Sequence, residues 1–235
     1  MKVFLLAAGK GSRISKNIPD IPKCTLPIDG KPLILRTVEM LLKHQAEITI
    51  IVGYRYQRIV EILKDMPVNI VYNPFFDVTN SIASLWLAKT YMTDEDTIIA
   101  NADVFWVEGL YEFIKKQIRD VFLLSDVKHV LDGDYFFGTE DGVILRYGKE
   151  LTLEERTCEY VGIAYISASV MPAFRTRLNE MIEHQHHSVW WENVLYDMTK
   201  DREIYAIDVE GRFWAEVDFI EDYQKIKKYV EEHRE

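Results

Sequence analysis

Residues 3–13, VFLLAAGKGSR, decide the fold, because a short apolar run passes here directly into a turn that contains two glycines. The run Val3–Ala8 is predicted to form a buried first strand. The small residues that follow allow the backbone to approach a ligand closely, and successive N–H groups of such a turn can hold an anion. Arg13 would add a guanidinium group to the same site.

This turn matches neither of two common phosphate-binding motifs. It is not a Walker P-loop, which needs GKS or GKT after four intervening residues, and it lacks the complete GxGxxG of a dinucleotide-binding fold. By itself, a glycine-containing turn after a strand is equally typical of a tight connection without function.

Short apolar strands alternate with amphipathic helices beyond this segment. Further buried strands are predicted at residues 48–52, 68–72, 97–101, 121–125 and 161–166. Helices are predicted at residues 33–44, 56–64, 81–91, 109–118, 171–184, 191–200 and 223–232. This alternation is typical of an α/β fold in which a mixed, mainly parallel sheet is covered by helices on both faces.

Residues 126–160 break the alternation with short, glycine-punctuated segments such as DYFFGTEDGVILRYG. They predict a small antiparallel hairpin region appended to the central sheet. No repeat, linker or low-complexity stretch divides the chain, so we expect residues 1–235 to form a single domain.

Composition and charge exclude several classes of protein. The net charge of −10 argues against a nucleic-acid binder, which needs clustered Lys and Arg. No apolar run approaches the length that crosses a bilayer, and the two cysteines, Cys24 and Cys158, lack the spacing of a zinc site or a disulfide framework. We therefore expect a cytoplasmic protein without a membrane partner.

Two later motifs extend the opening segment. PKCTLP follows at Pro22–Pro27, and GKPLI follows at Gly30–Ile34. Together with LAAGKGSR at Leu6–Arg13, the series resembles the opening of nucleotidyltransferases that activate sugar 1-phosphates and phosphorylated alcohols. The resemblance implies a Rossmann-like three-layer sandwich in which the glycine loop wraps a nucleoside triphosphate and Arg13 and Lys23 neutralise its phosphates.

The resemblance also implies a magnesium site. Open α/β sheets bind ligands at the carboxyl ends of their strands, and Asp103 follows the predicted strand 97–101. Its expected partner is Asp218, because two carboxylates can hold one hard divalent cation and leave room for triphosphate oxygens. Asn101 stands where this family usually has a first Asp. Glu216 is expected on the opposite face of the late strand and is left out of the Mg²⁺ site.

A pyrimidine-recognition segment is implied by the residues after the third strand. Asn80–Leu85 resembles the segment with which bacterial phosphocholine cytidylyltransferases read the base, although an N-capped helix start explains the same residues. The residues that the resemblance assigns to the nucleotide are Leu6, Ala7, Ala8, Gly9, Gly11, Ser12, Arg13, Lys23, Gly53, Tyr54, Asn80, Ser84 and Ala102.

The acceptor pocket is expected around Ser188–Asn193, SVWWEN. A quaternary ammonium is bound best by aromatic faces near a carboxylate, which suits Trp190 and Glu192. Adjacent tryptophans are equally typical of core packing. The complete acceptor set comprises Lys128, Tyr135, Glu159, Trp190, Trp191 and Glu192. Residues 126–160 lack the Trp that phosphocholine enzymes often carry there, which leaves primary-amine acceptors open.

The leading hypothesis is a Mg²⁺-dependent enzyme that transfers CMP from CTP to phosphocholine and releases pyrophosphate. Its catalytic residues would be Arg13, Lys23, Asp103 and Asp218, and no general base is needed because the acceptor phosphate is already ionised. Alternatives are transfer to 2-aminoethylphosphonate or phosphoethanolamine, transfer to a sugar 1-phosphate, and a catalytically silent nucleotide-binding module. A monomer or a homodimer is expected.

Overall fold

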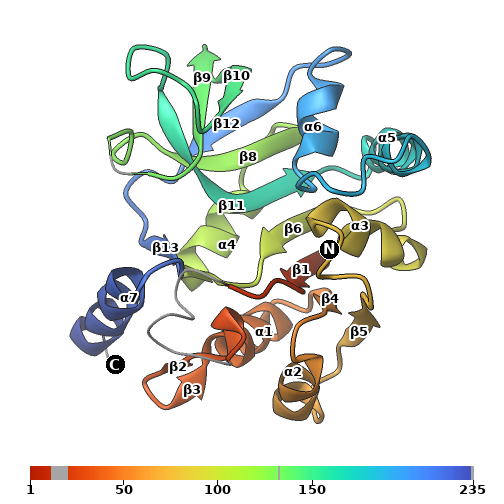
Figure 1. Ribbon diagram of the computed structural model, residues 1–235. Coiled ribbons are helices and arrows are strands. Elements are labelled where there is room, and N and C mark those ends of the chain that lie inside the picture. Colours follow the sequence, from red (N-terminus) through yellow and green to blue (C-terminus); the bar gives the residue numbers. More distant parts are fainter. Residues whose placement is uncertain (12–20, 132, 234–235) are drawn as a thin grey trace.

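The first half of the chain forms the parallel part of a nine-stranded sheet. The computed structural model describes residues 1–11, 21–131 and 133–233. Strand β1 (Lys2–Ala7) lies between β4 (Glu47–Val52) and β6 (Thr97–Asn101), and β5 (Asn69–Tyr72) pairs with β4. All three pairings are parallel, which brings the carboxyl ends of these strands to one edge (Figure 1).

The second half of the sheet is mixed and curls back on itself. Its strands are β11 (Cys158–Ile166), β8 (Val121–Asp126), β12 (Tyr205–Asp208), β10 (Val143–Gly148) and β9 (Phe136–Glu140). Strand β11 is antiparallel to β6 and β8, and β12 runs parallel to β8. Strand β9 pairs with β10 and also with β11, so the hairpin region is joined to the main sheet at two places.

Helices cover both faces of the sheet, as the side-chain alternation of β1 shows. The helices are α1 (Leu33–Lys43), α2 (Tyr56–Leu63), α3 (Ser81–Leu87), α4 (Glu108–Lys115), α5 (Met171–Glu183), α6 (Asn193–Met198) and α7 (Ile220–Glu232). Val3 and Leu5 face the apolar cluster that contains α1, α2 and α4, whereas Phe4 faces the cluster that contains α3, α5 and α6. The predicted three-layer sandwich with a mixed sheet is confirmed.

Smaller elements connect the ends of the chain. Strand β7 (Val104–Trp106) pairs antiparallel with β13 (Trp214–Glu216), which carries the late part of the chain to the end of β6. A short hairpin of β2 (Pro27–Ile28) and β3 (Lys31–Pro32) packs with α7 in a third apolar cluster. In the described part of the chain, 3-10 turns lie at Lys23–Thr25 and Lys89–Tyr91.

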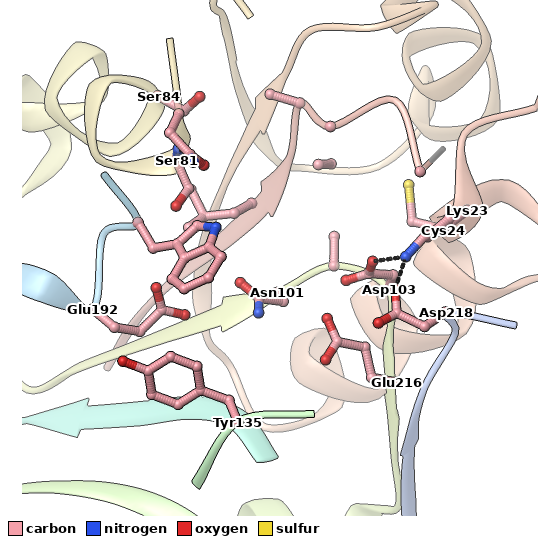
Figure 2. Close-up of a pocket in the computed structure, with 18 of the residues that line it drawn as sticks. Lys23, Cys24, Ser81, Ser84, Asn101, Asp103, Tyr135, Glu192, Glu216 and Asp218 are labelled. Atoms are coloured by element: carbon pink, nitrogen blue, oxygen red, sulfur yellow. Dashed lines mark hydrogen bonds and ion pairs between the residues drawn. The ribbon is translucent and has the colours of Figure 1, made fainter. Parts of the chain in front are cut away.

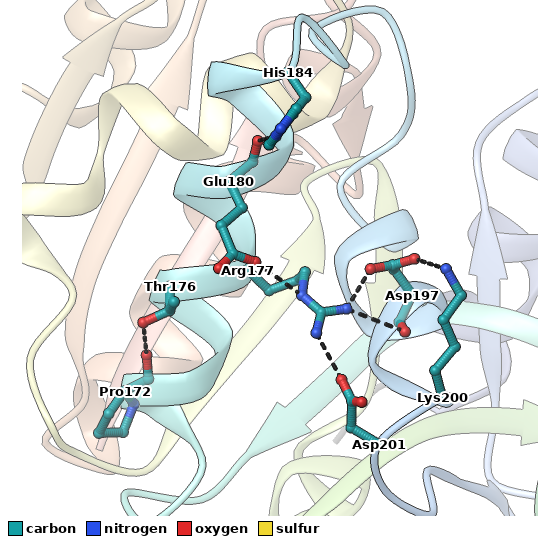
Figure 3. Close-up of polar contacts among 8 residues, drawn as sticks. All are labelled: Pro172, Thr176, Arg177, Glu180, His184, Asp197, Lys200 and Asp201. Atoms are coloured by element: carbon teal, nitrogen blue, oxygen red, sulfur yellow. Dashed lines mark hydrogen bonds and ion pairs between the residues drawn. The ribbon is translucent and has the colours of Figure 1, made fainter.

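Helix α5 holds α6 by a polar contact (Figure 3). The guanidinium of Arg177 forms ion pairs with Asp197 and, at 2.6 Å, with Asp201, and it also donates to the Asp197 carbonyl at 3.3 Å. This contact fixes the helix that follows Trp190–Glu192.

Several element boundaries differ from the sequence-based prediction. Helix α6 begins only at Asn193 because the N–H of Trp191 donates to Ser81 Oγ at 2.9 Å and so ties this turn to α3. Helix α7 begins earlier than predicted because the Asp222 carboxylate accepts from the N–H of Phe219 at 2.7 Å and caps it. Strand β12 was not predicted. Among the described residues, none of the helices has the length and apolar character that crossing a bilayer requires.

Candidate active site

A cavity of ≈510 Å³ opens at the carboxyl ends of β1 and β6. Its volume suits a nucleotide or a small phosphorylated ligand, since ligand pockets are typically roughly 300–1,000 Å³. Figure 2 shows two chemically different ends. Lys23, Asp103, Glu216 and Asp218 gather at one end, and Glu192 lies near Tyr135 at the other.

The turn after β1, which was predicted to bind the nucleotide, lies beside the cavity. Leu6, Ala7, Ala8, Gly9 and Gly11 all lie on its wall, together with Ala102 after β6. A Cβ on Gly11 would lie 2.6 Å from the Lys23 side chain, and the residue has a φ of +62°. Glycine is therefore required here for the close approach of Lys23. Ser12 and Arg13 lie outside the described residues.

Gly53 packs against this turn and does not belong to the described wall of the cavity. The N–H of Tyr54 donates to the Ala8 carbonyl at 3.0 Å, and a Cβ on Gly53 would lie 2.7 Å from the same oxygen. The position thus demands glycine because two backbone segments touch.

Asp103, Glu216 and Asp218 form a compact carboxylate cluster. One oxygen from each lies within 4.8 Å of the others. The expectation that Glu216 points to the opposite face is wrong, because residues two apart on an extended strand share a face. The β7–β13 register sets Glu216 opposite Val104, and the N–H of Val217 donates to the Asp103 carbonyl at 3.0 Å.

Lys23 places an ammonium group in this cluster. Its Nζ forms an ion pair with Asp218 and lies 3.4 Å from Asp103 Oδ2. Burial lowers the pKa of Lys23, but the neighbouring carboxylates, Asp103 first, outweigh it and raise the pKa. Burial also raises the pKa of Asp103, and it raises that of Glu216 well above the ordinary value. A nearby cation is therefore needed to keep the carboxyl groups of the cluster ionised.

Helix α3 carries the predicted base-binding residues. The Asn80 side chain caps the helix by accepting from the Ser81 N–H at 2.7 Å, and it donates to the Ser188 carbonyl at 3.3 Å. Ser84 Oγ accepts from Asn73 Nδ2 at 2.9 Å. Asn80 and Ser84 both line the cavity, so the capping role and a ligand role are compatible.

Aromatic residues surround the opposite end of the cavity, where the acceptor is expected. Trp190 meets Tyr135 edge to face, with ring centroids 5.7 Å apart, and both line the cavity with Tyr160 and Tyr196. Burial raises the pKa of Glu192 to about 7, an effect that Tyr160 and Asn101 partly offset. Asn101 Oδ1 also accepts from Trp191 Nε1 at 3.4 Å.

Three of the predicted acceptor residues lie apart from the described wall of the cavity. Trp191 is fully buried in the core under α3 and α5. The Glu159 carboxylate accepts from the Asp134 N–H at 2.9 Å and supports the turn before β9. Lys128 is exposed, with its Nζ near Gly211. Tyr135, Trp190 and Glu192 are thus the members of this set that the fold brings together.

Tyr196, Tyr160 and Lys149 are among the cavity residues that were not predicted from the sequence. Tyr196 follows Glu192 by four residues, a spacing that places side chains on one helix face and would have indicated it. Tyr160 lies next to Glu159 in a strand and carries no sequence signal that separates it from a core tyrosine. Lys149, after β10, ion-pairs with Asp134 at 2.6 Å across the hairpin region.

Comparisons with known proteins found a matching family model and similar sequences. The MobA-like NTP transferase domain matches residues 3–125. A choline-phosphate cytidylyltransferase from Streptococcus pneumoniae is 22% identical, over 98% of this chain and 98% of that protein. A 2-aminoethylphosphonate cytidylyltransferase from Lancefieldella rimae is 25% identical, over 92% of this chain and 88% of its own length.

The fold also matches solved structures. The structure of the CTP:phosphocholine cytidylyltransferase from Streptococcus pneumoniae superposes with a TM-score of 0.79 at 20% identity, covering 97% of this chain and 98% of that one. At this identity the superposition establishes the common fold. It does not assign roles to individual residues.

Proposed function

Because the chain belongs to the MobA-like NTP transferase family and is a nucleotidyltransferase, we propose that it is a cytidylyltransferase. It would transfer CMP from CTP to a small phosphorylated amino-alcohol of the phosphocholine type and release pyrophosphate. The observation that carries the proposal is one cavity with two ends, a carboxylate cluster beside a backbone-lined turn and a buried carboxyl group among aromatic rings.

The carboxylate cluster suits magnesium. Carboxylate oxygens are the ligands that this hard cation prefers, and the ammonium of Lys23 already occupies the position of a cation between Asp103 and Asp218. Asp103, Glu216 and Asp218 would hold the ion. When bound, Mg²⁺ would neutralise charge on the triphosphate.

The protein's own groups would orient the two substrates. The backbone of residues 6–11 would hold the triphosphate, and Lys23, which lies close to Gly11, would neutralise its charge. Asn80 and Ser84 would contact the base. An oxygen of the acceptor phosphate would attack the α-phosphorus of CTP, the bond to the bridging oxygen would break, and pyrophosphate would leave with that oxygen.

The polarity of the acceptor end favours an amine over a sugar. Glu192 is a single buried carboxyl group flanked by aromatic rings, which suits one positive charge on a small ligand. A sugar would instead need several hydrogen-bonding groups around its hydroxyls. This feature supports the amino-alcohol over the sugar 1-phosphate.

Pyrophosphate release tests the proposal directly. Purified protein with Mg²⁺ should release pyrophosphate with CTP and a phosphorylated amino-alcohol, and much less with ATP, GTP or UTP. Asp103→Asn should lower turnover by roughly 100-fold or more, since charge stabilisation at the site is lost. Asp65→Asn, which changes an exposed carboxylate near the end of α2, is the matched control and should leave turnover unchanged. Release with sugar 1-phosphates alone, or full activity of Asp103→Asn, would contradict it.

A further inference from the structure

The hydroxyl group of Tyr160 points to a ligand contact at the acceptor end of the cavity. Tyr160 lies in β11, lines the cavity and is 8% exposed. Among the described residues its hydroxyl oxygen has no partner with good hydrogen-bond geometry, although the Glu192 carboxyl group is near enough to add to the effect of burial and raise its pKa. Burial raises its pKa well above the usual value, so the phenol stays protonated. Because buried polar groups are nearly always hydrogen-bonded, a ligand is the natural source of the missing contact.

Glu192 beside it lacks a cation. The residue is 7% exposed, and no Lys or Arg in the described part of the chain forms an ion pair with its carboxyl group. A buried carboxylate without a cation is costly, and here burial keeps the pKa near neutrality. A positively charged ligand group would therefore be bound next to Tyr160.

The aromatic rings around Tyr160 and Glu192 already contact other side chains of the protein. Tyr196 stacks on Tyr135 and on Tyr147, with ring centroids 5.9 Å and 4.2 Å apart. The Trp190 ring carries the ammonium of Lys149, 5.4 Å from its centroid. A quaternary ammonium binds through open ring faces, and a second cation at Trp190 would be repelled by the first.

The inference rests on the proposed function and specifies its acceptor. We propose that Tyr160 determines specificity, with its oxygen accepting an N–H from the acceptor ammonium while Glu192 balances the charge. The acceptor is then a short phosphorylated chain that ends in a protonated primary amine. A trimethylated nitrogen offers only methyl groups, so it would leave the Tyr160 hydroxyl unsatisfied.

Two acceptors and two variants test this assignment. The values of kcat and KM are measured with CTP and Mg²⁺ for phosphoethanolamine and for phosphocholine. The wild-type protein should favour phosphoethanolamine by roughly tenfold or more in kcat/KM, because a site built to hydrogen-bond an N–H rejects an analogue without one. Tyr160→Phe should raise the KM for phosphoethanolamine by about tenfold, change kcat little, and leave phosphocholine unaffected.

Tyr165→Phe is the matched control. It removes a hydroxyl from the same strand, but Tyr165 packs on Phe122 on the other face of the sheet. Both acceptors should keep their kinetic constants in this variant. If Tyr160→Phe fails to fold, the acceptor preference of the wild-type protein decides the question alone.

The possible failures are distinguishable. Preference of the wild-type protein for phosphocholine, or an equal loss for both acceptors in Tyr160→Phe, would overturn the role of Tyr160 and leave the cytidylyltransferase proposal standing. Absence of CTP-dependent turnover with either amine would overturn both.

Discussion

Lys23 balances the charge of three carboxylates whose positions depend on distant parts of the chain. Its Nζ lies in the cluster of Asp103, Glu216 and Asp218, and its side chain is 11% exposed. If this cluster binds a divalent cation, as proposed, the cation and the ammonium would compete for the same oxygens unless Lys23 moves toward the triphosphate. The metal should bind more weakly to the free protein than to the protein with nucleotide.

Lys23→Met tests this competition. Removing the cation leaves buried carboxylates uncompensated, which should lower the free energy of unfolding by roughly 3–5 kcal/mol without divalent ions. Mg²⁺ should then stabilise the variant more than the wild-type protein, as thermal unfolding with and without MgCl₂ would show. Lys31→Met, which breaks an exposed pair with Glu39, should cost less than about 1 kcal/mol and show no added response. Equal Mg²⁺ responses would argue against the competition.

Glu192 should make stability depend on pH. Its pKa is raised to about 7 by burial, so between pH ~4.5 and 7 the folded state binds a proton that the unfolded state releases. The contribution is complete below this window and is lost as pH rises through it, by up to about 3 kcal/mol. Urea unfolding at pH 5 and pH 8 should show this loss in the wild-type protein. Glu192→Gln should show a smaller loss, and an identical pH dependence of both would refute the assignment.

The sequence predicted those cavity residues whose motifs are local. The turn of residues 6–11, Asp103 and Trp190 all line the cavity, because short motifs place them directly after strands or in one loop. Lys128 and Trp191 do not line its described wall, since their positions depend on tertiary packing that no local pattern reports. Glu216 was misplaced through an error of strand periodicity, not for lack of a signal.

At the scale of single elements, the bulge in β11 orients the acceptor end of the cavity. The register of β11 against β8 shifts between Tyr160 and Ala164, and Gly162 within it has a φ of +84°. A Cβ at Gly162 would lie 2.8 Å from Val104. The irregularity lets Tyr160 line the cavity while the rest of the strand stays in the sheet.

Gly162→Ala should therefore destabilise the protein. The left-handed conformation costs an alanine about 1–2 kcal/mol, and the contact with Val104 adds to this. The free energy of urea unfolding should fall by at least about 1 kcal/mol, and the KM for the acceptor should rise. Gly109→Ala is the control variant. Gly109 lies in α4, where alanine stabilises the helix relative to glycine, and the added Cβ would meet nothing within 4 Å. If Gly162→Ala left the free energy of unfolding unchanged, the proposed structural role of the bulge would be refuted.

Most elements were predicted because their apolar pattern is strong. Strand β1 is an almost continuous buried run, and the buried positions of α1 recur at helical spacing. Strand β12 was missed because all four of its residues are only partly buried. The return of β9 to β11 was missed for a different reason. Pairing between strands is a property of the assembled sheet, and the hairpin pattern specifies only the local partner.

At the scale of the whole molecule, the sheet joins the halves of the chain. Strand β6 pairs on one side with β1 and on the other with β11, and the apolar clusters on both faces include residues from both halves. The family model matches residues 3–125, so its match ends within a sheet that continues into the second half of the chain. We propose that the chain unfolds as one unit.

Unfolding in urea tests this proposal. Tryptophan fluorescence, which reports on residues such as Trp86 and Trp214 in different layers, and far-UV circular dichroism should give one transition with the same midpoint. Two separated transitions would show that residues 126–233 form an independent unit.

The pairing of β7 with β13 also bears on when the protein becomes active during its synthesis. Asp218 follows Lys23 by 195 residues. At about 5–20 residues per second, a ribosome needs roughly 10–40 s to make the intervening chain. A nascent chain that ends before β13 has only one of the carboxylates of the cluster, so under the proposed function transfer would await translation of the late strand.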